Sequence, residues 1–138
     1  MSTQKLWEPS QSFIENCHLE RYKNWLSINR GLEFISYQEL WQWSITEIED
    51  FWESIWDYFN ILSHKPYTKV KSKHKMPNCK WFEGATLNYA EHVFRNAKDH
   101  ETAIVFGNET ADIQEITWLE LKAKVASLAS YFISKGVT

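Results

Sequence analysis

The sequence is poor in glycine, cysteine and proline, with four, two and three of these residues among 138. The glycines stand far apart, so no glycine-rich loop is present that could wrap the phosphates of a nucleotide. Cys17 and Cys79 are distant in sequence, and neither a signal peptide nor a long apolar run accompanies them. We therefore predict a reducing, cytoplasmic setting and no membrane partner.

Net charge is also low, at −3, which argues against a nucleic-acid partner recruited by overall electrostatics. The charges are unevenly spread, because residues 31–63 hold seven acids and no Lys or Arg, whereas residues 64–80 hold six lysines and no acid. The lysines are Lys65, Lys69, Lys71, Lys73, Lys75 and Lys80. They could hold an anionic ligand, but a solvated connector explains the same pattern, and we expect the connector.

Residues for metal or nucleophilic chemistry are few and poorly spaced. His74 and Cys79 form the closest mixed pair, but no second pair completes a recognised zinc spacing, so we expect no metal site. A nucleophile pair of Cys79 with His92 or His100 has no support in the local sequence, since such partners meet only in a fold. We expect no catalytic, cofactor-binding or metal-binding residue within the chain.

Aromatic residues, by contrast, are abundant at 16%, and seven of the eight tryptophans lie at or before Trp81. One set recurs at three- and four-residue steps, the spacing of a single helix face: Phe51, Trp52, Ile55, Trp56 and Phe59. Two interpretations of this stripe stay open. It forms the core of a small helical unit, or part of it is an interface to a larger body.

The first half has three helix-opening Ser-x-x-Glu boxes. The box at Ser12 predicts a helix over residues 13–29 that ends at Gly31, with an apolar stripe that includes Tyr22, Leu26 and Ile28. The box at Ser36 predicts a short helix, and the box at Ser44 predicts a longer one to about residue 60. Residues 1–11, which include Leu6 and Trp7, are expected to form an extended arm.

The second half alternates helix and strand patterns. Asn88 opens a helix that is predicted to end near residue 97, with Tyr89, Val93 and Phe94 facing inward. Residues 103–106 and 114–117 predict a hairpin whose turn includes residues 107 and 108. Thr117 caps a last helix that ends at Gly136, and its inward stripe is Leu121, Val125, Leu128 and Phe132. Val137 and Thr138 look like a link into another strand, so we expect a piece of a longer protein.

Residues 81–91 read Trp-Phe-Glu-Gly-Ala-Thr-Leu-Asn-Tyr-Ala-Glu and resemble the Trp-Phe-x-Gly-x-x-Leu-Asn-Tyr-Ala-Glu segment near the start of acetoacetyl-CoA synthetases, members of the AMP-forming acyl-CoA synthetase superfamily. Four further motifs resemble the same region in the same order: Trp7-Glu8-Pro9, Tyr37-x-x-Leu40-x-x-Trp43-Ser44, Phe51-Trp52-x-x-x-Trp56 and Ile116-Thr117-Trp118-x-Glu120-Leu121. The resemblance covers essentially the whole chain. Acetyl- and propionyl-CoA synthetases have a similar segment, and Thr86 and His92 depart from the acetoacetyl pattern, so the substrate subclass stays open.

The resemblance implies a ligase that activates a short-chain keto acid with ATP and Mg²⁺ to an acyl-adenylate and passes the acyl group to coenzyme A. The catalytic motifs of this family lie beyond residue 138, so this stretch alone is expected to be inactive and to bind no cofactor. The implied fold is α+β and mostly helical. Residues 1–80 are a helical cap with an arm and a Lys-rich connector, and residues 81–138 begin an α/β adenylate-forming domain.

The implied partner is the remainder of the parent enzyme, with self-association of the fragment also possible. Within residues 81–91 we expect a scaffold, in which Trp81 and Phe82 anchor the chain, Gly84 permits a close backbone approach, and Asn88 with Glu91 caps a helix. The alternative from a different class is a free-standing helical interaction module that uses its tryptophans and lysines to bind a partner.

Overall fold

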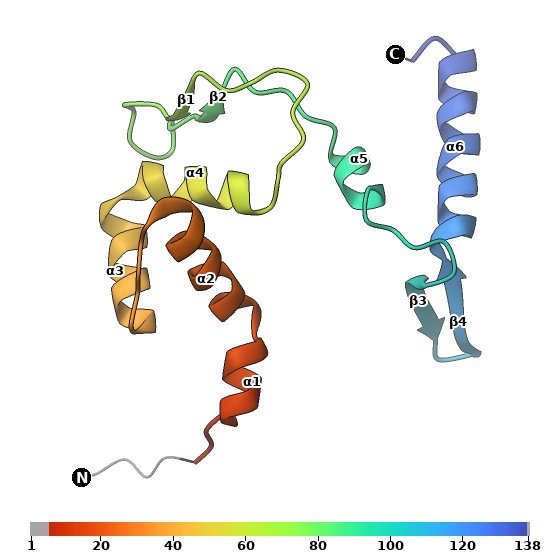
Figure 1. The fold of residues 1–138 in the computed structure, drawn as a ribbon. Coiled ribbons are helices and arrows are strands. Elements are labelled where there is room, and N and C mark those ends of the chain that lie inside the picture. The colour runs from red at the N-terminus through yellow and green to blue at the C-terminus, as the bar shows by residue number, and fades with distance from the viewer. Residues whose placement is uncertain (1–5, 138) are drawn as a thin grey trace. The chain divides into compact units, whose positions relative to one another are not determined.

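The computed structural model describes residues 6–137, and its contacts divide the chain into two units, with the division between Thr86 and Leu87. The elements of the first unit are α1 (Gln11–Asn16), α2 (His18–Arg30), α3 (Tyr37–Thr46), α4 (Ile48–Tyr58), β1 (Lys69–Lys71) and β2 (Trp81–Glu83). Those of the second are α5 (Tyr89–Phe94), β3 (Thr102–Asn108), β4 (Ala111–Thr117) and α6 (Trp118–Ser134) (Figure 1). The predicted α+β class with mostly helical content is confirmed. Among the described residues, no helix combines the length and hydrophobicity that a bilayer crossing requires.

The helix predicted over residues 13–29 is two helices, because the chain breaks at Cys17. Cys17 has extended backbone angles, with φ −73° and ψ 158°, and its N–H donates to the carbonyl of Ile14. The first cap is Ser10 rather than Ser12, since the Ser10 side chain accepts from the N–H of Phe13. Gly31 ends α2 in the left-handed conformation, as predicted. Of the predicted arm, residues 1–5 lie outside the described residues.

The third predicted box, at Ser44, is wrong, whereas the second, at Ser36, opens α3 as expected. The Ser36 hydroxyl accepts from the N–H of Glu39 at 3.2 Å. Ser44 lies inside α3, where its hydroxyl donates to the carbonyl of Trp41. A Ser hydroxyl that finds a carbonyl in the preceding turn no longer competes with the helix, so α3 continues to Thr46. Helix α4 then begins after Glu47, whose side chain forms no capping bond.

The core of the first unit lies where α2, α3 and α4 meet, around Tyr22, Leu26 and Leu40. Leu26 is completely buried. The partly buried residues that pack on these three are Trp25, Leu32, Phe34, Trp43, Phe51, Ile55 and Tyr58. Ile28, which we had assigned to the same stripe of α2, is 82% exposed, because its position on the helix turns it to solvent.

Residues 64–80 are not simply a solvated connector, because they contribute a strand. Lys69 and Lys71 of β1 pair antiparallel with Glu83 and Trp81 of β2. Val70, between the two lysines, is buried at 8% exposure. Alternation along a strand places Val70 inward and its lysine neighbours outward. With a single apolar residue among lysines, the sequence offered too short a pattern to predict this strand.

The second unit begins with the short helix α5 and continues as the β3–β4 hairpin and helix α6. The Asn88 side chain accepts from the N–H of Glu91, as predicted, but α5 ends at Phe94 and Tyr89 is 79% exposed rather than inward. The hairpin turns at residues 109 and 110, so the predicted turn residues 107 and 108 belong to the end of β3. Thr117 and Glu120 form the predicted reciprocal capping box of α6.

No residue of this second unit, within 87–137, is buried. Phe94 and Trp118 form an edge-to-face pair at 5.9 Å, which is the aromatic contact at the base of α6. The stripe predicted to face inward is largely open, with Val125 at 39%, Leu128 at 54% and Phe132 at 46% exposure. The second unit thus has secondary structure without a core of its own.

Candidate functional site

Residues singled out for metal or nucleophilic chemistry do not form a site in the described structure. Within residues 6–137, no group of three or more His, Cys, Asp or Glu side chains is placed to hold a metal ion. Cys79 lies in the first unit, where its thiol is 4.0 Å from the Ser72 hydroxyl and 3.8 Å from the carbonyl of Lys80. His92 and His100, its proposed partners, belong to the second unit.

Five of the six lysines lie on β1 or in the loop between β1 and β2, and Lys65 precedes β1. Ser72 is buried and fixes the loop, because its N–H donates to the carbonyl of Lys80 and its hydroxyl accepts from the N–H of Lys80. A shallow depression lies on this surface, lined by Lys69, Ser72, Lys73, His74, Lys80 and Glu83. Glu83 lies 3.9 Å from the ammonium group of Lys80, so one carboxylate offsets part of the positive charge.

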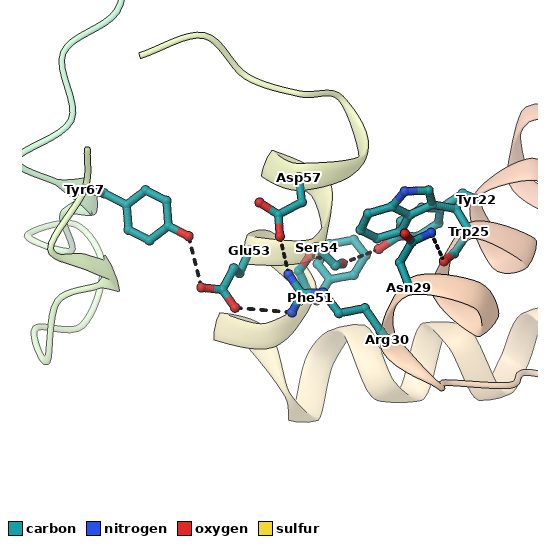
Figure 2. A network of polar contacts seen from close by, with 9 residues as sticks. All are labelled: Tyr22, Trp25, Asn29, Arg30, Phe51, Glu53, Ser54, Asp57 and Tyr67. Atoms are coloured by element: carbon teal, nitrogen blue, oxygen red, sulfur yellow. Dashed lines mark hydrogen bonds and ion pairs between the residues drawn. The ribbon is translucent and has the colours of Figure 1, made fainter. Parts of the chain in front are cut away.

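A network centred on Arg30 is the most connected polar feature of the first unit (Figure 2). The Arg30 guanidinium at the end of α2 donates to Glu53 at 3.3 Å and to Asp57 at 2.5 Å, both on α4. The Tyr67 hydroxyl, from the loop before β1, donates to the other oxygen of Glu53 at 3.0 Å. One carboxylate of α4 therefore joins α2 and the loop before β1. Sequence reasoning missed this network, because the residues that bond to one another are 14 to 27 positions apart and follow no local motif.

A second polar contact lies deeper in the same packing. The Tyr22 hydroxyl is 2.6 Å from the Ser54 hydroxyl, which in turn donates to the carbonyl of Phe51. Because the single Ser54 proton is used in that bond, the Tyr22 hydroxyl must be the donor to Ser54. The two buried hydroxyls thus satisfy each other, as buried polar groups in a folded core require.

The electrostatics of this network hold its groups in fixed charge states. Burial and the hydrogen bond to Glu53 raise the pKa of Tyr67 to about 12, so this phenol stays neutral. Burial also raises the pKa of Tyr22. Burial acts to lower the pKa of Arg30, but the hydrogen bonds to Asp57 and Glu53 outweigh it and the pKa is raised. A neutral phenol and a permanent guanidinium suit a structural clamp rather than proton transfer near pH 7.

Aromatic rings also join α4 to the β1–β2 hairpin. Trp52 packs edge-to-face against Trp81 at 5.6 Å, and Trp56 packs against Phe82 at 4.5 Å. Tyr67 contacts both Trp56 and Phe82, at 5.2 and 5.3 Å. The prediction that Trp81 and Phe82 anchor this stretch is confirmed. The stripe of α4 is therefore divided, with Phe51 and Ile55 in the helical core and the two tryptophans against the hairpin.

Gly84 permits the turn that follows these rings, for a reason that differs from our prediction. Its φ is +93°, a conformation that favours glycine. A Cβ added there would meet Thr68 and the carbonyl of Pro66 at ordinary contact distances of 3.7 to 3.8 Å. The backbone angle, and not a close approach of another backbone, thus explains the glycine.

Comparison with known proteins finds the same region in larger enzymes. Residues 37–93 match the family described as acetyl-coenzyme A synthetase N-terminus. The acetoacetyl-CoA synthetase of Gallus gallus is 32% identical over 142 residues, covering 99% of this chain and 21% of that protein. For the acetoacetyl-CoA synthetase of Xenopus tropicalis the identity is 30%, over 99% of this chain and 20% of that protein. The solved structure of acetoacetyl-CoA synthetase from Streptomyces lividans has a TM-score of 0.88 and 36% identity, covering 98% of this chain and 21% of that chain.

The chain is a homologue of the N-terminal region of acetoacetyl-CoA synthetases.

The acetoacetyl-CoA synthetase resemblance inferred from residues 81–91 and the four accompanying motifs is thereby confirmed. The chain spans about a fifth of the length of the acetoacetyl-CoA synthetases it matches. Residues 81–83 fold with the first unit, whose division from the second lies after Thr86. The start of an adenylate-forming domain of the acetoacetyl-CoA synthetase type at residue 81 stays a prediction.

Proposed function

We propose that this chain is the N-terminal part of an acetoacetyl-CoA synthetase-like ligase. Such an enzyme activates a short-chain keto acid with ATP and Mg²⁺ to an acyl-adenylate, and then transfers the acyl group to coenzyme A. The observation that carries this proposal is the match to acetoacetyl-CoA synthetases in sequence and fold over nearly the whole chain.

In this proposal the chain contributes structure rather than chemistry. The Arg30 network and the rings on α4 bond and pack between elements of the first unit, and they join three of its segments. Stabilisation of charge on the phosphates, the main catalytic device expected of such a ligase, belongs to motifs outside this stretch. The 138-residue chain alone is therefore expected to be inactive.

ATP–pyrophosphate exchange tests both parts of the proposal. The 138-residue chain should show no acid-dependent exchange, whereas the longer parent protein should show exchange that depends on acetoacetate. Activity of the chain alone would contradict its structural role. A reading frame that stops after Thr138 would instead favour the free-standing interaction module.

A second ligase subclass is favoured by one specific observation. The family that matches residues 37–93 is described by acetyl-CoA synthetase rather than by acetoacetyl-CoA synthetase. The same exchange assay, run with acetate and propionate beside acetoacetate, decides between the two. A parent that prefers acetate or propionate belongs to the acetyl- and propionyl-CoA synthetase type.

A further inference from the structure

The feature that the proposed function leaves unexplained is the open apolar stripe of α6. Leu121, Val125, Leu128 and Phe132 follow steps of four, three and four residues, so they lie along one face of the helix. From Val125 onward the residues of this stripe are at least 39% exposed. A stripe with this spacing is characteristic of a helix face that is buried in the complete protein.

The contacts within the second unit reach only the beginning of α6. The N–H groups of Trp118 and Leu119 donate to the carbonyls of Glu101 and Asp99, and the Lys122 ammonium group bonds to the Asp99 carboxylate at 2.6 Å. Helix α6 leads away from the β3–β4 hairpin (Figure 1). The part of α6 that carries Val125, Leu128 and Phe132 is thus left largely open by the other elements described in its unit.

The hairpin is also open, on both of its faces, because alternation along the strands places Ile104 and Phe106 on one face and Val105 and Ile113 on the other. Ile104, Val105 and Phe106 of β3 and Ile113 of β4 are 40%, 60%, 46% and 75% exposed. Within residues 6–137, β3 pairs with β4 alone, which leaves the outer edge of each strand free to accept a further strand. A two-stranded sheet with apolar residues on it is marginal in water without a covering layer.

We propose that the stripe of α6 is the docking surface for a segment of the same polypeptide that lies beyond residue 138. This inference rests on the proposed function. The relatives that match this chain are about five times its length, so the parent supplies ample chain to cover the face. The stripe itself carries no charge, and an apolar layer of the parent matches it better than a charged partner would.

Hydroxyl-radical footprinting, which labels exposed side chains, tests the proposal without any substitution. Leu128 and Phe132 should be labelled strongly in the 138-residue chain and protected in the parent, whereas Ile28 of α2 serves as an exposed reference. Equal labelling in both proteins would overturn the proposal. Protection already present in the 138-residue chain would also overturn it, since the occupant would then be part of this chain or a second copy.

Substitution gives an independent readout. Lys is a good helix former, so Leu128→Lys with Phe132→Lys keeps α6 intact while it removes the apolar stripe. In the parent the melting temperature should fall by several degrees, whereas in the 138-residue chain it should stay unchanged and binding of a hydrophobic dye should fall. The matched control, Ile28→Lys, should leave the parent melting temperature unchanged. A parent that tolerates the double substitution as well as the control contradicts the docking surface.

The two proposals can fail separately. If the parent prefers an acid other than acetoacetate but still protects Leu128 and Phe132, the substrate assignment is wrong and the docking surface stands. If the parent has acetoacetate-dependent exchange and leaves the stripe labelled, the docking surface is wrong and the function stands.

Discussion

Each unit combines helices with one two-stranded sheet, but among the described residues only those of the first include buried ones. In the first unit, α2, α3 and α4 are joined by short connections and fold back on one another, so their apolar faces meet around Leu26. In the second unit, the hairpin is followed by a helix that leads away from it, and no residue within 87–137 is buried. An amphipathic pattern thus predicts that a face will be buried, but the order of elements decides whether the partner belongs to the same stretch.

The comparison also explains why the tryptophans concentrate in the first unit. In the first unit large rings fill the core with few residues, whereas the smaller second unit has no buried residue within 87–137 to fill. On helix α4, Phe51 packs toward the other helices, whereas Trp52 and Trp56 pack against the hairpin. In the second unit the single tryptophan, Trp118, marks the base of α6.

The largest expected difference between the units comes from a matched pair of leucine truncations in the 138-residue chain. Leu26→Ala should lower the free energy of unfolding of the first unit by about 2 to 5 kcal/mol, because it leaves a cavity at a fully buried position. Leu128→Ala should change stability by less than about 0.5 kcal/mol, because the side chain is 54% exposed.

Urea unfolding followed by tryptophan fluorescence measures the first effect, since seven of the eight tryptophans lie in the first unit. Circular dichroism of the two variants checks that their helix content is unchanged before denaturation. If both truncations had the same small effect, the first unit would not have the closed core described above.

A smaller effect is expected from the helix caps, which have the same geometry in both units. The Ser36 and Asn88 side chains accept from the N–H groups of Glu39 and Glu91 at 3.2 and 3.3 Å. Each change to Ala should cost about 1 kcal/mol. Ser36→Ala should shift the cooperative unfolding of the first unit, whereas Asn88→Ala should speed amide exchange within α5 only.

In the parent enzyme, Asn88→Ala should lower the melting temperature without a direct effect on chemistry. A variant that retained the melting temperature but lost turnover would show that Asn88 acts in catalysis and not as a scaffold. Ser36→Ala, measured in the same two assays, is the control for the loss of a cap.

Local signals in the sequence predicted the local structure well. Gly31, Ser36, Asn88 and Thr117 each act through residues three or four positions away, so their helix ends could be read from the sequence. The box at Ser44 failed because the same Ser-x-x-Glu spacing also occurs inside a helix, where the hydroxyl bonds to a carbonyl of the preceding turn. A motif of two residues cannot distinguish these two cases.

Contacts between distant segments could not be predicted in this way. Arg30, Glu53 and Tyr67 meet because three elements pack together, and nothing within four residues of any of them signals the network. The β1–β2 pairing was missed for the same reason, since Val70 alone identifies the inner face of a three-residue strand. The divided role of the α4 stripe, part core and part hairpin contact, also required the fold.

The smallest expected effect concerns pH, and it has opposite signs in the two units. In the first unit the raised pKa of Tyr67, about 12 because of burial and the bond to Glu53, exceeds the ordinary value of about 10. The unfolded state therefore loses this proton first, and stability present below about pH 10 is lost as the pH rises toward 12. In the second unit the hydrogen bonds from Thr117 lower the pKa of Glu120, and the bond from Lys122 lowers that of Asp99. Their contribution is present at neutral pH and is lost as the pH falls below about 4.

Alkaline titration should thus weaken the first unit, and Tyr67→Phe should reduce that loss, whereas Tyr131→Phe, at an exposed position of α6, should not. Acid should loosen the start of α6, which amide exchange at that end of the helix would measure. Equal alkaline loss in both phenylalanine variants would mean that the Tyr67–Glu53 bond does not join the hairpin to α4 in solution.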